Sequence, residues 1–160
     1  MRGVTVDESN HGAPPPMSHA AILYPVLCQV LLTFTVLILM ARARSRSMRS
    51  LGQKLDDRDM RLGQNAWTDE AVQAANNYKN QFEMPVLFYA VCAFALILRQ
   101  VDTVLVALAW VFALSRIAHS VVHIGPNMIP PRAVTFLIGV AALLTMWIVL
   151  GVRVWGGAGV

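Results

Sequence analysis

Residues 20–41 read AAILYPVLCQVLLTFTVLILMA, an uncharged stretch of 22 residues that decides the fold class. A helix needs about 20 mostly apolar residues to cross the hydrocarbon core of a bilayer, so this stretch predicts a transmembrane helix. The rest of the 160-residue chain agrees, because 56% of its residues are hydrophobic and only 14% are charged. Soluble domains carry about 25% charged residues. The composition therefore argues against a soluble domain, a disordered chain, a nucleic-acid-binding module and a disulfide scaffold.

Three further apolar stretches follow the first. Residues 84–98 and 133–152 contain 15 and 20 positions without a charge, and residues 103–115 contain 13. The second and third stretches along the chain, 84–98 and 103–115, reach membrane length only if a few polar residues are tolerated at membrane depth. We therefore predict an all-α integral membrane protein, a bundle of four transmembrane helices. The predicted organisation is a flexible tail at 1–19, a membrane domain at 20–153 with spans 20–41, 76–98, 103–124 and 133–152, a loop at 42–75, and a second tail at 154–160.

Basic residues are concentrated in the connection between the first and second predicted spans, and they account for most of the net charge of +4. The positive-inside rule puts such a loop in the cytoplasm. With four spans, both termini are then expected on the non-cytoplasmic side, and the cell inner membrane is the expected location. The cluster favours contact with lipid headgroups over nucleic acid. Its members are Arg42, Arg44, Arg46, Arg49, Lys54, Arg58 and Arg61.

The second predicted span carries a stripe of polar residues. Asn76, Asn80 and Glu83 recur at i, i+4 and i+7, so they share one helical face. Pro85 lacks a backbone donor and predicts a local kink just after them. At 1.5 Å per residue, Glu83 would lie about 10 Å inside the membrane. A charged group at that depth is costly unless it finds a partner.

The third predicted span carries a matching stripe, in which Arg116, His119 and His123 recur at i, i+3 and i+7. Arg116 would lie about 12 Å below the end of this antiparallel helix, at nearly the depth of Glu83. We therefore expect Glu83 and Arg116 to pair across the helix interface. Such a pair can be a structural clamp, or part of a site for an anionic or zwitterionic ligand. His119 and His123 could share a metal ion, but no third ligand has suitable spacing, so no metal is expected.

The polar residues of these two spans stand in a recognisable order. Residues 80–85, NQFEMP, together with Phe88 resemble the N-x-x-E-x-P-x-x-F signature of the MAPEG family, the membrane-associated proteins in eicosanoid and glutathione metabolism. Residues 116–119, RIAH, resemble that family's R-x-x-(Tyr or His) element in the third helix. Arg132 at the start of the fourth helix and the basic stretch 40–44, MARAR, also fit. The resemblance extends over roughly residues 20 to 153.

Resemblance to this family implies a homotrimer of four-helix subunits with both termini on the non-cytoplasmic side. In the family's enzymes, glutathione binds between subunits near the cytoplasmic face, and an arginine favours the thiolate. That thiolate attacks a lipophilic electrophile or a peroxide. The resemblance therefore implies a glutathione-dependent transferase or peroxidase acting on lipophilic substrates. The alternative is a non-catalytic structural or lipid-binding membrane protein in which Glu83 and Arg116 form a buried clamp.

The same resemblance carries over site residues by position. Arg42 and Arg132 are the candidate catalytic residues that would stabilise a thiolate. Asn76 stands where glutathione-using members usually carry an arginine, with Lys79 three residues later. Loss of that arginine removes a bidentate contact to a carboxylate, so the enzyme hypothesis requires another cation to replace it. The candidate glutathione-binding residues are Asn76, Asn80, Glu83, Arg116, His119 and His123.

Overall fold

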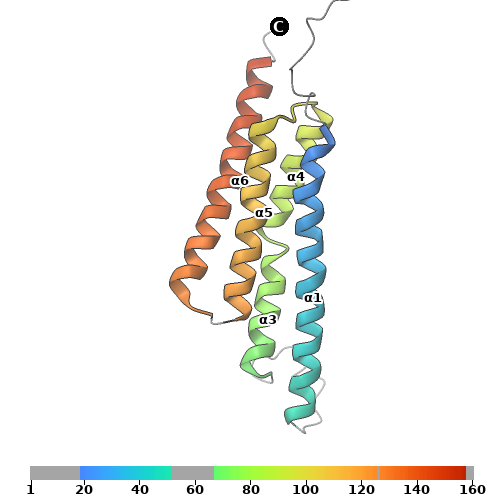
Figure 1. The fold of residues 1–160 in the computed structure, drawn as a ribbon, viewed down its shortest axis with the longest axis vertical. Coiled ribbons are helices and arrows are strands. Elements are labelled where there is room, and N and C mark those ends of the chain that lie inside the picture. The colour runs from blue at the N-terminus through green and yellow to red at the C-terminus, as the bar shows by residue number, and fades with distance from the viewer. Residues whose placement is uncertain (1–18, 52–66, 126, 158–160) are drawn as a thin grey trace, which may run out of the picture.

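The computed structural model describes residues 19–51, 67–125 and 127–157. Across these ranges the chain is helical and contains no strand. Figure 1 shows α1 and α5 running in one direction and the α3–α4 pair and α6 in the other, so the first and last described residues lie at the same end of the bundle. The elements are η1 (His19–Ile22), α1 (Leu23–Leu51), α3 (Asp69–Asn80), α4 (Met84–Ile97), α5 (Thr103–Ile124) and α6 (Ile129–Gly157).

Four segments of the described chain are long and apolar enough to cross a membrane, and together they form one bundle. Many of their large apolar side chains face outward, as a lipid environment requires. The prediction of an all-α, four-helix membrane protein is thus confirmed. The predicted tail 1–19 lies outside the described residues except for His19, as do residues 52–66 of the predicted loop and residues 158–160. The four segments are Ala20–Ser50, Asp69–Ile97, Thr103–Ile124 and Ile129–Gly157.

The first helix is longer than its apolar stretch, since α1 continues through residues 42–51, where the sequence predicted a loop. This basic extension packs on α3 through small side chains. Ala43 is 3% exposed and forms a cluster with two alanines of α3. The guanidinium of Arg44 lies 5.3 Å from the centre of the Trp67 ring. The extension is held by these contacts, which apolar periodicity alone does not reveal.

The second span consists of two helices, because the chain leaves helical geometry between them. α3 ends at Asn80 and α4 begins at Met84, with Pro85 in the first turn of α4. Proline is tolerated in a first turn, but inside a helix it lacks a donor and clashes with the carbonyl one turn earlier. In a continuous helix the Met84 N–H would bond to the Asn80 carbonyl oxygen. The interruption leaves that oxygen open to a donor from elsewhere.

Among the helices that the structure describes, the third and fourth spans, α5 and α6, make the most extensive contact. Gly139 of α6 permits this close approach, because a Cβ at that position would lie 2.6 Å from Oγ of Ser115 on α5. α4 joins the same core through Phe88, whose ring stacks on that of Phe112 with their centres 4.4 Å apart. These contacts hold α4, α5 and α6 together and so position the polar residues of α5 and α6.

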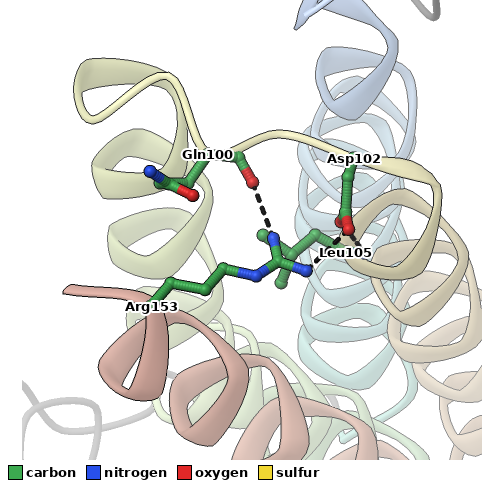
Figure 2. A network of polar contacts seen from close by, with 4 residues as sticks. All are labelled: Gln100, Asp102, Leu105 and Arg153. Carbon is green, nitrogen blue, oxygen red and sulfur yellow. Dashed lines mark hydrogen bonds and ion pairs between the residues drawn. The ribbon is translucent and has the colours of Figure 1, made fainter. Parts of the chain in front are cut away.

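A polar network ties the α4–α5 turn to the end of α6 (Figure 2). Arg153 donates from Nη1 to the carbonyl oxygen of Gln100 at 3.0 Å and from Nη2 to Oδ2 of Asp102 at 2.6 Å. The other carboxylate oxygen of Asp102 accepts from the backbone N–H of Leu105 at 3.0 Å and so caps α5. The hydrogen bond from Arg153 holds the pKa of the Asp102 carboxyl below its usual range.

Candidate functional site

A cavity of about 510 Å³ opens between the α3–α4 junction, α5 and the first turns of α6. It lies toward the end of the bundle opposite the described termini. The two predicted polar stripes meet here, because five of the six candidate binding residues line the cavity, and so does Arg132. The lining consists of Asn76, Lys79, Asn80, Glu83, His119, His123, Ile129, Arg132, Ala133 and Phe136.

Arg116, the sixth candidate, is 1% exposed and reaches toward the α3–α4 junction. Its Nη2 donates to the backbone carbonyl oxygen of Asn80 at 2.9 Å. Glu83 is exposed, and no ion pair within the described ranges joins it to Arg116. The two charges interact only at longer range. The predicted direct Glu83–Arg116 pair is therefore wrong, because the interruption before Pro85 offers Arg116 a carbonyl oxygen closer than the carboxylate.

His119 and His123 lie one turn apart on α5, and they are 3% and 5% exposed. The centres of their rings are 5.6 Å apart. His119 Nε2 and His123 Nδ1 are buried and have no hydrogen-bond partner among the residues that the structure describes. Buried polar atoms in proteins nearly always have a partner. Since both residues line the cavity, these two nitrogens leave hydrogen-bonding capacity unused beside it.

A metal ion would need more ligands than this histidine pair supplies. Within residues 19–51, 67–125 and 127–157 there is no group of three or more histidine, cysteine, aspartate or glutamate side chains that could hold one.

The two candidate catalytic arginines lie in different places. Arg132 lines the cavity, and its Nη1 donates to Oδ1 of Asn127 at 2.9 Å. Asn127 has a φ of 48°, in the left-handed region that asparagine adopts more readily than most residues. Arg42 lies instead on α1, where it lines a separate hollow of about 570 Å³ with Arg46 and Arg49. A single chain thus brings Arg132, but not Arg42, to the cavity.

A buried polar network behind the cavity was missed by the sequence analysis. Gln29 of α1 donates from Nε2 to Oε1 of Gln81 at 2.9 Å. The Nε2 of Gln81 in turn donates to Ser120 Oγ at 3.2 Å and to Asn77 Oδ1 at 3.3 Å. Asn77 and Gln81 recur at i and i+4, beside the stripe that was recognised, so a second polar face was visible in the sequence. This network joins α1, the α3–α4 junction and α5.

The described residues form four membrane-length segments, and three of them line a polar cavity. This arrangement defines a class of multi-pass membrane protein with a hydrophilic site in an apolar body. The family model described as the MAPEG family matches residues 22–152, which is most of the chain. The protein therefore belongs to the MAPEG family. Searches of curated proteins and of solved structures each found no match.

Proposed function

We propose that the cavity between the α3–α4 junction, α5 and α6 binds glutathione, or a thiol with the same charge pattern. The main support is that charges of both signs face this one cavity. Lys79 and Arg132 are cations suited to the carboxylates of glutathione, and Glu83 is suited to its ammonium group. Lys79 and Arg132 would together replace the arginine that is missing at Asn76.

The uncharged residues of the cavity fit the same ligand. Asn76 and Asn80 line the α3 side and offer amide groups that can pair with peptide bonds. His119 and His123 each contribute a buried ring nitrogen that lacks a partner among the described residues. A peptide thiol supplies donors and acceptors that could satisfy both. The donor set of the cavity therefore fits glutathione without a metal ion.

We further propose that the bound thiol reacts with a lipophilic electrophile or a peroxide. The guanidinium of Arg132 provides a positive charge in the cavity, and such a charge favours the thiolate form of a thiol. The apolar body of the bundle suits substrates that reach the site from the bilayer. The enzyme would then be a glutathione-dependent transferase or peroxidase.

The proposed assembly is a homotrimer in the cell inner membrane, with both termini on the non-cytoplasmic side. The basic extension of α1 lies toward the same end of the bundle as the cavity, and the positive-inside rule puts basic residues in the cytoplasm. Arg42 on α1 would contribute to a site only if that site belonged to a neighbouring subunit. The family resemblance favours this arrangement, because glutathione sites in the family's enzymes lie between subunits.

The second candidate function is a non-catalytic structural or lipid-binding membrane protein. It is favoured by the position of Arg116, which joins α5 to the α3–α4 junction through the Asn80 carbonyl oxygen. A residue in that position holds helices together whether or not a ligand is present.

Isothermal titration calorimetry of the detergent-solubilised protein with glutathione distinguishes the two functions. We expect saturable binding that weakens about tenfold to a hundredfold in Arg132→Gln, the size of one charge-assisted hydrogen bond. Arg99→Gln is the matched control, because Arg99 is an exposed arginine in the α4–α5 turn, away from the cavity. No saturable heat at millimolar glutathione would rule out the proposed function and favour the structural alternative.

A further inference from the structure

The imidazole of His119 is fixed in one tautomer by its neighbour on α6. Its Nδ1 lies 3.1 Å from the backbone carbonyl oxygen of Arg132. A carbonyl oxygen can only accept a hydrogen bond, so the proton of this contact must be on Nδ1. In the neutral ring the other nitrogen, Nε2, then carries a lone pair and can only accept. The bonded nitrogen thus determines what the second nitrogen can do.

The second nitrogen of His119 has unused hydrogen-bonding capacity. Nε2 is buried and has no partner among the described residues, while His119 itself lines the cavity. The ring is held in place by the Arg132 contact and by the Phe136 ring, whose centre is 5.9 Å away. A ligand that places a hydrogen-bond donor near this lone pair would satisfy it. A thiol is such a donor, whereas a carboxylate is not.

Charged and titratable groups face His119 from α5, from α6 and from the α3–α4 side. Arg116 on α5 precedes His119 by one turn, and Arg132 on α6 contacts the ring through its backbone carbonyl oxygen. His123 lies one turn further along α5, and Lys79 and Glu83 face the same cavity from the α3–α4 side. Cations outnumber the single carboxylate in this group. These surroundings favour a ligand that becomes an anion, as a thiol does when it loses its proton.

We propose that His119 is the general base of this site, an inference that rests on the proposed thiol function. Nε2 takes the proton of the substrate thiol: the S–H bond breaks, an N–H bond forms, and the electron pair stays on sulfur. The sulfur then forms a bond to an electrophilic carbon, such as that of an epoxide, whose C–O electron pair moves to oxygen. His119 returns its proton to that oxygen. The atoms balance, and the imidazole ends each cycle neutral.

In this step the backbone and the side chain of Arg132 have separate roles. Its backbone carbonyl oxygen orients the His119 ring, and its side chain places a positive charge in the cavity. Removal of the Arg132 side chain should therefore leave the tautomer of His119 unchanged. Nitrogen NMR of histidine-labelled protein reports that tautomer directly. We expect a protonated Nδ1 and a bare Nε2 in the ligand-free protein and in Arg132→Gln.

The decisive variant is His119→Asn. The amide nitrogen of asparagine can replace Nδ1 as the donor to the Arg132 carbonyl oxygen, but asparagine has no basic nitrogen in place of Nε2. We expect the thiolate ultraviolet absorbance of bound glutathione at pH 7 to fall at least tenfold, and the chemical rate to fall about a hundredfold or more, as for loss of a general base. Arg99→Gln, which changes an exposed arginine outside the cavity lining, is the control and is expected to retain the thiolate absorbance at saturating glutathione.

S-methylglutathione separates failure of this inference from failure of the proposed function. It has no ionisable thiol, so wild type and His119→Asn should bind it with the same affinity. If neither glutathione nor its methyl derivative binds the wild type, the proposed function is wrong. If both bind, but His119→Asn forms as much thiolate as the wild type, the site exists and the role of His119 as general base is overturned.

Discussion

Arg116 shows how a buried cation can be used in a membrane bundle without a carboxylate beside it. It sits at 1% exposure in α5 and donates to a backbone oxygen that the α3–α4 interruption has left open. In lipid, every backbone polar group must find a partner within the protein. The guanidinium thus satisfies the backbone of the second span, while Glu83 remains free to face the cavity.

Substitution of Arg116 and of Glu83 should therefore have unequal effects on stability. Arg116→Met keeps a long side chain but removes the donor to Asn80, and we expect it to lower the free energy of unfolding by about 1–3 kcal/mol, the cost of one orphaned buried acceptor. Glu83→Gln should change it by no more than about 0.5 kcal/mol, as for other exposed sites. Denaturation in mixed micelles measures both. Equal losses of unfolding free energy in the two variants would instead support a direct ion pair between Glu83 and Arg116.

Asp102 predicts an acid-sensitive contribution to stability at the other end of the bundle. Its pKa is lowered in the folded protein by Arg153, so its contribution is full above the pKa of the unfolded carboxyl and is lost as the pH falls through the folded value. Because the side chain is 41% exposed, solvent screening limits the ion pair to about 0–1 kcal/mol. Asp102→Asn retains an oxygen to cap α5 but removes the charge. Its unfolding should lose this part of the acid dependence, whereas an unchanged pH profile would contradict it.

At the scale of elements, apolar length predicts the four spans. It does not predict the break between α3 and α4, and this break gives Arg116 a different partner from the expected Glu83. The stripe at Asn76, Asn80 and Glu83 was derived for a continuous helix, and these residues do line one cavity with His119 and His123. Glu83, however, follows the end of α3, so its direction no longer obeys the helical repeat. The partner of Arg116 is a backbone atom, and side-chain patterns contain no information about which backbone oxygen is open.

The packing of α5 against α6 yields a prediction with a built-in control. Gly139→Ala would force its Cβ to 2.6 Å from Ser115 Oγ, a hydroxyl that already donates to the Phe112 carbonyl oxygen at 2.7 Å. We expect a loss of about 1–3 kcal/mol in unfolding free energy, as for other overpacked interfaces. Gly151→Ala lies on the same helix, and apart from its chain neighbours and the backbone of its own helix no atom lies within 4 Å of the added Cβ. This control should be neutral or stabilising; a similar loss in both variants would refute the packing argument.

At the scale of the whole molecule, one chain presents a cavity with Arg132 and, on a different helix, a separate arginine cluster that includes Arg42. Nothing in the sequence fixes whether these two regions belong to one site, because that depends on how subunits meet. Apolar side chains face outward from all four spans, so lipid and neighbouring subunits have the same kind of surface to contact. Composition alone cannot separate the two environments.

Mixed assemblies test whether neighbouring subunits share a site. If Arg42 of one subunit completes the cavity that holds Arg132 of the next, co-expression of Arg42→Ala and Arg132→Ala chains should restore about a quarter of the sites, since random assembly pairs two intact halves that often. Either variant alone should be inactive in glutathione conjugation. If the mixture is as inactive as the single variants, Arg42 does not act across a subunit interface.

The bond between Arg116 and the Asn80 carbonyl oxygen also bears on biogenesis. The second span leaves the ribosome before the third, so its broken backbone has no donor from α5 when it first reaches the translocon. Arg116 on its own is an expensive residue to insert into lipid. Each segment thus lacks, when alone, what the other supplies. We expect the two to partition into the bilayer as a hairpin rather than one after the other.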